Sequence, residues 1–199
     1  MTKPPAIMKP DRLSAFTDGV IAIIITIMVL ELPVPEGDSW DALRPSFPLF
    51  GAYALSFANV GIFWVNHHHM LHLAKRVDGH ALLANLFLLF WLSLVPFVIR
   101  WVGEAGIDPM PVAAYGAVLV MASLGYLLLE RALIVAEGDG SSLDNVLGSK
   151  KKEIVSVLLY LTAVGIAFVS VWASVAIYVG VALFWLIPDR RVEEALPDV

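Results

Sequence analysis

The sequence contains no cysteine, which excludes disulfide bonds, catalytic thiols and thiolate metal sites. Charged residues are also scarce: Asp, Glu, Lys and Arg make up 16% of 199 residues, whereas hydrophobic residues make up 59%. The mean hydropathy of +0.79 exceeds what a soluble domain of this size needs to fill its core. The composition therefore indicates a membrane protein whose chain crosses the bilayer several times.

The sequence also has no glycine-rich nucleotide loop, coiled coil or internal repeat. The acidic residues of its longest polar connection, 136–152, match no calcium-binding loop, so we interpret this segment as solvated. A Thr-Val-Gly-Tyr-Gly segment is missing too, which excludes an ion filter built from backbone carbonyls. We therefore expect no enzyme, no cofactor, no metal and no nucleic-acid partner.

Apolar runs of about 20 residues are long enough to cross a bilayer. They predict six helices, at 13–32, 45–65, 81–102, 112–135, 154–170 and 172–187. The last two come from one uncharged stretch, which a turn near Ser170 to Ser174 would fold into a hairpin; a single long, tilted helix is the alternative. The expected fold class is an all-α integral membrane protein, with 1–199 forming a single domain.

The basic residues support an even number of crossings. With six helices, every Lys and Arg except Arg44 and Arg100 falls on one side of the membrane. The excess of positive charge in cytoplasmic segments then predicts that both termini are cytoplasmic. The N-terminal segment lacks the order of a cleavable signal, so we expect the first helix to be retained.

Four tryptophans lie near the ends of predicted helices: Trp40, Trp64, Trp101 and Trp185. Indole rings commonly anchor a helix at the membrane interface. We interpret these residues as anchors, and no cofactor is needed to explain them.

The first predicted helix contains an acidic residue, Asp18, about one and a half turns beyond Arg12. A carboxylate inside a membrane helix costs roughly 2.5 to 3.5 kcal/mol on the milder insertion scales, so it normally faces other helices or a water-filled path. Polar residues on the next two helices are expected at a similar depth. Together they predict one network: Arg12, Thr17, Asp18, His67 or His68, and Asn85. Such a network either fixes helix packing or gates a pathway by rearranging, and the two roles are compatible.

The histidines that end the second predicted helix offer a further interpretation. His68 and His72 are four residues apart, which places two imidazoles on one helix face and makes a zinc site geometrically conceivable. No carboxylate accompanies them in a metallohydrolase pattern. Sensing of pH is a second alternative, and a structural hydrogen-bonding role is the interpretation that we favour.

Several of these motifs together resemble a known family. The run from Arg12 to Val20 (RLSAFTDGV) is followed by WVNHH at 64–68, by VDG at 77–79, by Asn85, and by SLVPF at 93–97. This series is similar to the bacterial relatives of transmembrane protein 175, a family of potassium channels that lack a carbonyl filter. Phe16 and Asp18 match its Arg-x-x-x-Phe-Ser-Asp signature, and Thr17 replaces the serine. The substitution keeps a hydroxyl, and we expect it to keep the hydrogen bond.

The resemblance implies a homotetramer of six-helix subunits in the bacterial plasma (inner) membrane, with the first helix of each subunit lining a central pore and both termini cytoplasmic. Potassium ions would be the permeant partner, and the lipid bilayer the surrounding medium. The family's constriction is an isoleucine five residues after the signature Asp, which corresponds to Ile23. A threonine linked with selectivity corresponds to Thr26, and Ile27 and Leu30 correspond to further hydrophobic layers.

The residues themselves are compatible with this assignment. Ile23, Ile27 and Leu30 recur at helical spacing, and Thr26 lies beside them. Four copies around an axis would form narrow apolar rings that lose water and so close a pore without a moving lid. Packing or lipid contact is the alternative role for such a stripe.

We therefore predict a weakly to moderately potassium-selective cation channel that is gated and filtered by rings on its first helix. The alternative is a proton-coupled cation transporter that uses Asp18 and His67/His68. Neither an internal repeat nor a helix clearly broken at mid-membrane, which such transporters commonly have, is expected here. A metal-dependent membrane hydrolase that uses the histidines is the weakest hypothesis.

Overall fold

The computed structural model describes residues 9–138, 143 and 150–186. Its elements are helical: α1 (Pro10–Leu30), α2 (Trp40–Leu43), η1 (Arg44–Ser46), α3 (Phe47–Leu73), α4 (Gly79–Ser93), α5 (Val95–Ala105), α6 (Pro109–Glu137), α8 (Lys151–Ile166) and α9 (Val171–Leu186). The expected all-α class is confirmed. The two termini lie outside the described residues, and so does the prediction that both are cytoplasmic. Most of the connection 139–149 lies outside them as well.

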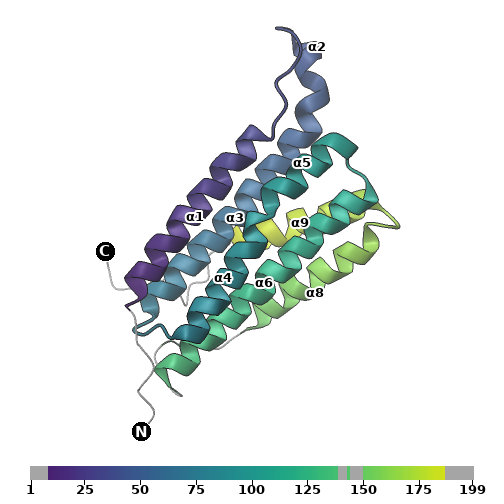
Figure 1. Ribbon diagram of the computed structural model, residues 1–199. Helices are drawn as coiled ribbons and strands as arrows, with labels where there is room; N and C mark the ends of the chain where they lie inside the picture. The colour runs from purple at the N-terminus through teal and green to yellow at the C-terminus, as the bar shows by residue number, and fades with distance from the viewer. Residues whose placement is uncertain (1–8, 139–142, 144–149, 187–199) are drawn as a thin grey trace.

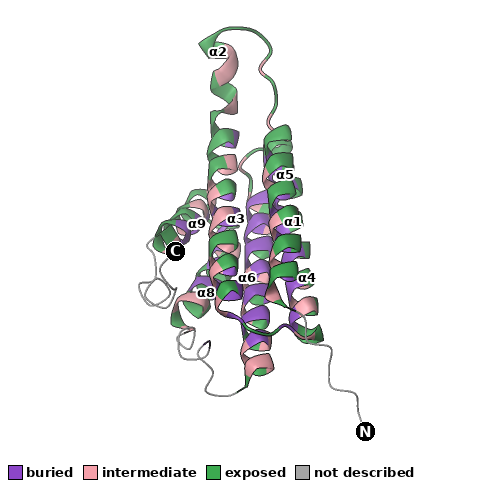
Figure 2. Ribbon diagram, turned by 90° about the vertical axis from the view of Figure 1, so that its left-hand side faces the viewer, coloured by how far each residue is buried: buried purple, intermediate pink, exposed green. Residues whose placement is uncertain are grey.

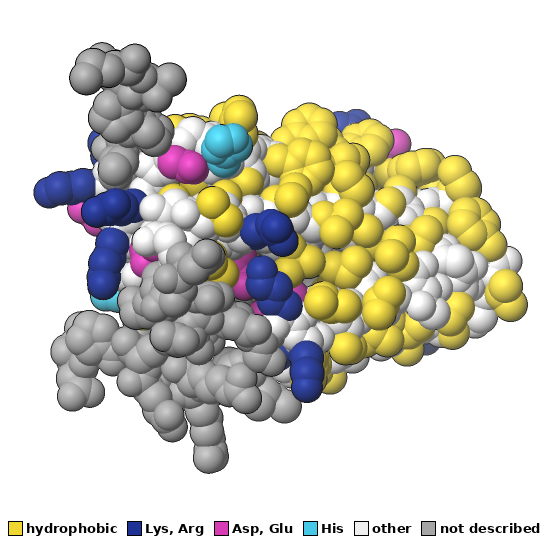
Figure 3. Space-filling model, turned by 90° about the horizontal axis from the view of Figure 1, so that it is seen from below, with side chains coloured by type: hydrophobic (Ala, Val, Ile, Leu, Met, Phe, Trp, Pro, Cys, Tyr) yellow, Lys and Arg dark blue, Asp and Glu magenta, His cyan; other side chains and the backbone are white. Residues whose placement is uncertain are grey.

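The long helices run up and down along one axis. Figure 1 shows α1, α3, the α4–α5 pair and α6 side by side, with α8 alongside α6 and α9 behind them. We call the end that holds the start of α1, the end of α3 and the start of α4 the basic end, and the opposite end the α2 end. Lys and Arg side chains gather around the basic end, and hydrophobic side chains cover much of the remaining surface in the same view (Figure 3). Among the described residues, only Arg44 and Arg100 are cations at the α2 end.

Within the described part of the chain, four segments are long and apolar enough to cross a membrane: 10–30, 40–73, 79–105 and 109–137. The second of these corrects the predicted boundary, because α3 continues past residue 65 to Leu73. Hydropathy falls at Asn66, but the backbone hydrogen bonds of a helix do not depend on side-chain polarity, and the Asn66 side chain itself donates to the Ile62 carbonyl. Trp64 therefore lies well inside α3 rather than at its end.

The third crossing is interrupted at Leu94, between α4 and α5. Pro96 lies in the first turn of α5, where its missing N–H and its ring cannot continue the ladder of α4. The chain keeps a bond from the Val98 N–H to the Leu94 carbonyl across this point. Leu94 keeps right-handed helical backbone angles, so the crossing is interrupted at one residue and is not unwound.

The apolar stretch that begins at Ile154 forms two helices rather than one. Helix α8 ends at Ile166, α9 begins at Val171, and the Ser174 hydroxyl donates to the Ala163 carbonyl (2.8 Å) across the turn. The alternative of a single long helix is thus wrong. Each helix has 16 residues, which at 1.5 Å per residue gives about 24 Å, less than the roughly 30 Å of a bilayer core.

The core lies where α4 packs on α6. Gly125 of α6 faces the backbone of Leu88, and a Cβ added there would lie 2.8 Å from the Leu88 Cα. Only glycine permits so close an approach of two helices. Helix α6 is the most buried of the long helices, whereas α1 keeps an exposed side along its length (Figure 2).

Candidate functional site

Helix α1 has two distinct sides. Its buried residues recur at helical spacing and face α3 and α4: Leu13, Thr17, Ile21, Ile24 and Met28. The opposite side, which we call the open face, comprises Arg12, Phe16, Gly19, Ile23, Thr26, Ile27 and Leu30, all exposed. Ile23 is 58% exposed and Leu30 is 78% exposed, although both are large and hydrophobic. A single subunit leaves this face without a packing partner.

Thr26 is the hydroxyl-bearing residue in the middle of the open face. Its Oγ1 donates to two carbonyls of its own helix, Ala22 at 3.0 Å and Ile23 at 2.9 Å. The hydroxyl hydrogen is thus directed along α1, and the acceptor lone pairs of the oxygen remain on the exposed side.

Three fully buried polar side chains tie α1 to its neighbours. Asn85 of α4 donates from Nδ2 to the Thr17 hydroxyl of α1 (2.9 Å), and its Oδ1 lies 2.8 Å from Nε2 of His67 on α3. Because a carbonyl oxygen can only accept, Nε2 of His67 carries the proton. We call this set the polar trio. Thr17, in place of the serine of the family signature, makes this bond to Asn85.

Asp18 lies beside the polar trio but has different partners. Its Oδ1 accepts from the indole nitrogen of Trp64 on α3 (2.8 Å), and its Oδ2 accepts from Ser14 (3.4 Å). Trp64 was missed by sequence reasoning, which treated it as an interface anchor. The available signal was its position one turn before His67 and His68.

The single predicted network is therefore divided. His68 does not join Asn85; its ring lies against Trp64 (5.9 Å between centroids) and stacks on His72 (6.2 Å). Arg12 is exposed and makes no ion pair with the residues that the structure describes. Across the same residues, no group of three His, Asp or Glu is arranged to hold a metal ion.

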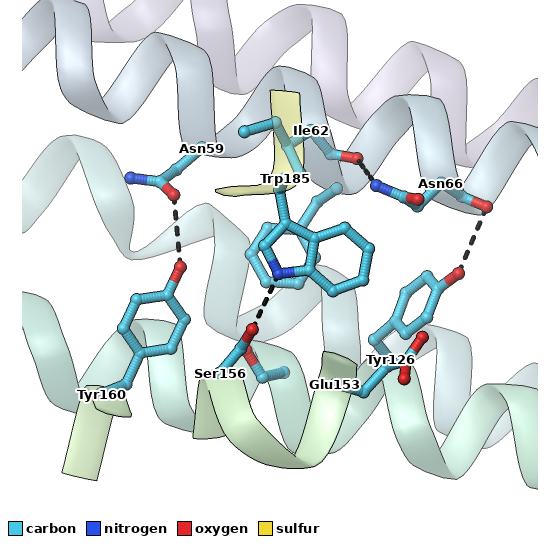
Figure 4. Close-up of a pocket in the computed structure, with 10 residues that line it drawn as sticks. Asn59, Ile62, Asn66, Tyr126, Glu153, Ser156, Tyr160 and Trp185 are labelled. Carbon is cyan, nitrogen blue, oxygen red and sulfur yellow. Dashed lines mark hydrogen bonds between the residues drawn. The ribbon is translucent and has the colours of Figure 1, made fainter. Parts of the chain in front are cut away.

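A small polar cavity of about 30 Å³ lies away from α1, between α3, α6, α8 and α9. Figure 4 shows its hydrogen bonds: Tyr160 to Asn59 Oδ1 (3.4 Å), Tyr126 to the Asn66 carbonyl (3.3 Å), and Trp185 Nε1 to the Ser156 hydroxyl (2.8 Å). Its volume suits a water molecule or two rather than a larger ligand. These bonds attach α8 and α9 to α3 and α6 and do not involve the open face.

Comparisons with known proteins find ion channels of one family. The family model described as the endosomal/lysosomal potassium channel TMEM175 matches residues 12–96. A potassium channel of Chryseobacterium sp. (strain P1-3) is 48% identical over 96% of this chain and 100% of its own length. A potassium channel of Chamaesiphon minutus is 32% identical over 93% of this chain and 97% of its own length. The crystal structure of a lysosomal potassium-selective channel TMEM175 homolog from Chamaesiphon minutus superposes with a TM-score of 0.76, at 29% identity, over 92% of this chain and 97% of that one.

Proposed function

This chain belongs to the TMEM175 family, and from that premise we propose that it forms a potassium-selective cation channel from four copies of the chain. The family and the named relatives are channels and not enzymes. The relatives named as potassium channels support conduction of potassium. The pore, its gate and its selectivity are argued below from this chain's own residues.

The open face of α1 is the observation that carries the proposal. A face that served only to contact lipid would be uniformly apolar, but this one begins with Arg12 and includes Gly19 and Thr26. Small and polar residues suit close helix contacts and water better than they suit hydrocarbon. Four α1 helices around a central axis would cover the open face and enclose a path, which one subunit cannot do.

Within that ring, the apolar side chains act as the gate. Rings of Ile23, Ile27 and Leu30 exclude water while they are narrow, and a modest widening admits water and a partly dehydrated cation. Ile23 forms the main constriction. Thr26 adds a ring of four hydroxyl oxygens whose lone pairs face the path, an arrangement that suits a cation.

The polar trio fixes α1 at the level of Thr17, because its bonds to α3 and α4 are directional and buried. Widening at Ile23 then requires α1 to tilt or bend beyond that anchor. Asp18 and Trp64 form a second, partly exposed tie that such a movement would strain or break. Both ties lie near the basic end, which we assign to the cytoplasm of a bacterium on the positive-inside rule. We count α8 and α9 as two short crossings, which makes six.

The test is to reconstitute the purified chain in planar bilayers and to record currents under opposed gradients of potassium and sodium. Discrete unitary currents that reverse nearer the potassium equilibrium potential are expected. The mass of the protein in detergent, measured by light scattering, should be four times that of the chain. Smooth, saturable flux that depends on a proton gradient, without unitary events, would instead favour a transporter and contradict the proposal.

A further inference from the structure

A second, much larger cavity lies at the α2 end. Its volume is about 440 Å³, and it is enclosed by the first turns of α3, by α5, by the start of α6 and by α9. The walls are mainly apolar and include Phe47, Leu55, Ile99, Val102 and Val175. Pockets of about 300–1,000 Å³ are typical of sites that bind small molecules. No residue of α1 lines it, so the cavity is separate from the open face.

Water is a poor occupant for this cavity. A buried water needs two to four polar partners, and the lining offers chiefly the hydroxyls of Ser56 and Tyr115. These two groups are already bonded to each other (3.2 Å), Ser56 also donates to the Ala52 carbonyl (2.8 Å), and Asn59 donates to Tyr115 (3.1 Å). An empty space of this size would forfeit dispersion contacts along all its walls. A hydrocarbon chain satisfies the lining best.

A cation precedes the residues that line the cavity. Phe47 and Pro48 line the cavity, and Arg44 lies one helical turn before them, with its carbonyl accepting from the Phe47 N–H. Arg44 is exposed and has no ion pair with the described residues, whereas Arg100, the other described cation at this end, pairs with Glu104 (2.9 Å) and Glu31 (3.9 Å). A guanidinium without a protein partner matches a phosphate well.

A large aromatic residue is part of the lining. Trp172, in the first turn of α9, lines the cavity and is 68% exposed. Indole rings of this kind commonly lie at the level of the lipid headgroups. Apolar walls and an exposed indole thus line the cavity, and an available guanidinium lies one helical turn before its first lining residue.

We propose that each subunit binds one phospholipid here, with an acyl chain inside the cavity and the phosphate at Arg44. Apolar complementarity accounts for the chain, and charge complementarity accounts for the headgroup. The bound chain would brace α5 against α3 and α9, on the side of the Leu94 break that faces the α2 end.

Gly51 provides a direct test. It lines the cavity, and a Cβ added to it would meet nothing within 4 Å, so Gly51→Leu fills the space without a clash. Gly61→Leu is the matched control, since Gly61 is on the same helix, also has open space at its Cβ, and does not line the cavity. Gly51→Met is a second filling variant, with a flexible side chain, in case the leucine variant does not fold.

The measurement is native mass spectrometry of the delipidated, assembled protein titrated with palmitoyl-oleoyl phosphatidylglycerol. We expect one tightly held lipid per subunit in the wild type and in Gly61→Leu, and loss of that lipid in Gly51→Leu or Gly51→Met. Equal lipid counts in the filled variants and the control would overturn the proposal. A wild-type protein that holds no lipid would also overturn it.

The headgroup contact is tested separately. Arg44→Gln should weaken phosphatidylglycerol retention about tenfold, whereas Arg76→Gln, an exposed cation at the basic end, should leave it unchanged. Palmitate that binds as tightly as the phospholipid, together with no effect of Arg44→Gln, would show a fatty-acid site and overturn the phospholipid assignment. The assay needs no ion flux, so its outcome is independent of the proposed channel activity.

Discussion

The side-chain amide of Asn85 donates to the Thr17 hydroxyl across 2.9 Å, and this bond joins α4 to α1 inside a fully buried site. Asn85 is at the centre of the polar trio, because its other amide atom meets His67. Neither partner is exposed to water, so each depends on the other for its hydrogen bond.

Removal of the Thr17 hydroxyl should therefore destabilise the subunit. Thr17→Val keeps the shape of the side chain but leaves the Asn85 donor unsatisfied, which we expect to lower the free energy of unfolding by about 1–3 kcal/mol. Thr17→Ser keeps the hydroxyl and should lose less. Thermal unfolding in detergent would measure both, and equal losses in the two variants would argue against a role for the bond.

At Ile23, a polar side chain should hydrate the proposed constriction. We expect Ile23→Asn to raise the resting conductance and to lower the potassium-to-sodium permeability ratio. Val29→Asn is the control, because Val29 is also exposed but lies about 120° away around α1. Reversal potentials in mixed potassium and sodium solutions measure the effect, and an unchanged ratio in Ile23→Asn would remove Ile23 from the gate.

Two substitutions of Thr26 separate the role of its hydroxyl oxygen from that of its methyl group. Thr26→Val removes the hydroxyl at constant shape and should reduce potassium selectivity, whereas Thr26→Ser should stay close to the wild type. Single-channel recordings provide both selectivity and conductance. A Ser variant as impaired as the Val variant would indicate that packing, not the oxygen, sets the property.

On α9, Trp185 should contribute to stability without affecting permeation. Trp185→Phe removes its bond to Ser156 beside the polar cavity, and we expect a loss of about 0.5–1.5 kcal/mol in the free energy of unfolding. The permeability ratio should not change, since Trp185 is remote from the open face. Trp101→Phe, whose ring contacts Phe97, is a suitable comparison.

The start of α4 should show a dependence on pH. Burial alone would raise the pKa of Asp78, but hydrogen bonds from the Ala81 N–H and from His80 hold that pKa below its ordinary value of 3.8. The lowered pKa means that the cap stabilises the fold above the ordinary value and loses its effect as the pH falls through the lowered one. We expect Asp78→Ala to lose about 1 kcal/mol at neutral pH.

Asp78→Asn keeps an acceptor for the cap but cannot titrate. Its unfolding temperature should therefore decline less than that of the wild type as the pH falls below 3.8. Identical acid profiles for the two proteins would assign the acid sensitivity to other carboxylates.

Much of the helical framework is predictable from the sequence, because long apolar runs indicate which segments can lie in the hydrocarbon core of a membrane. The end of α3 was not predictable in this way. Hydropathy changes at Asn66, but the helix ends only at Leu73, because the backbone hydrogen bonds of a helix do not depend on the polarity of its side chains. The interruption at Leu94 has a cause that is visible in the sequence, namely Pro96. A search for apolar runs does not detect it, because proline is apolar but cannot donate a backbone hydrogen bond to the preceding helix.

The partners of Asp18 could not be predicted for a different reason. Sequence placed Arg12 and His67 or His68 at its depth, but which side chain meets the carboxylate depends on the rotation of α1 against α3. That rotation is set by the whole buried side of α1, from Leu13 to Met28. The structure selects Trp64, the one that a hydropathy-based interpretation had assigned to the interface.

The glycine contact between α4 and α6 has a mechanical consequence. Because Gly125 receives the backbone of Leu88, a shift of either helix by one residue would drive Leu124 or Tyr126 into a slot that has no room for a side chain. The two helices are therefore fixed in register and form a rigid pair within each subunit. In the gating proposed above, α1 would move relative to this fixed pair, and the energy of opening would come from contacts outside it.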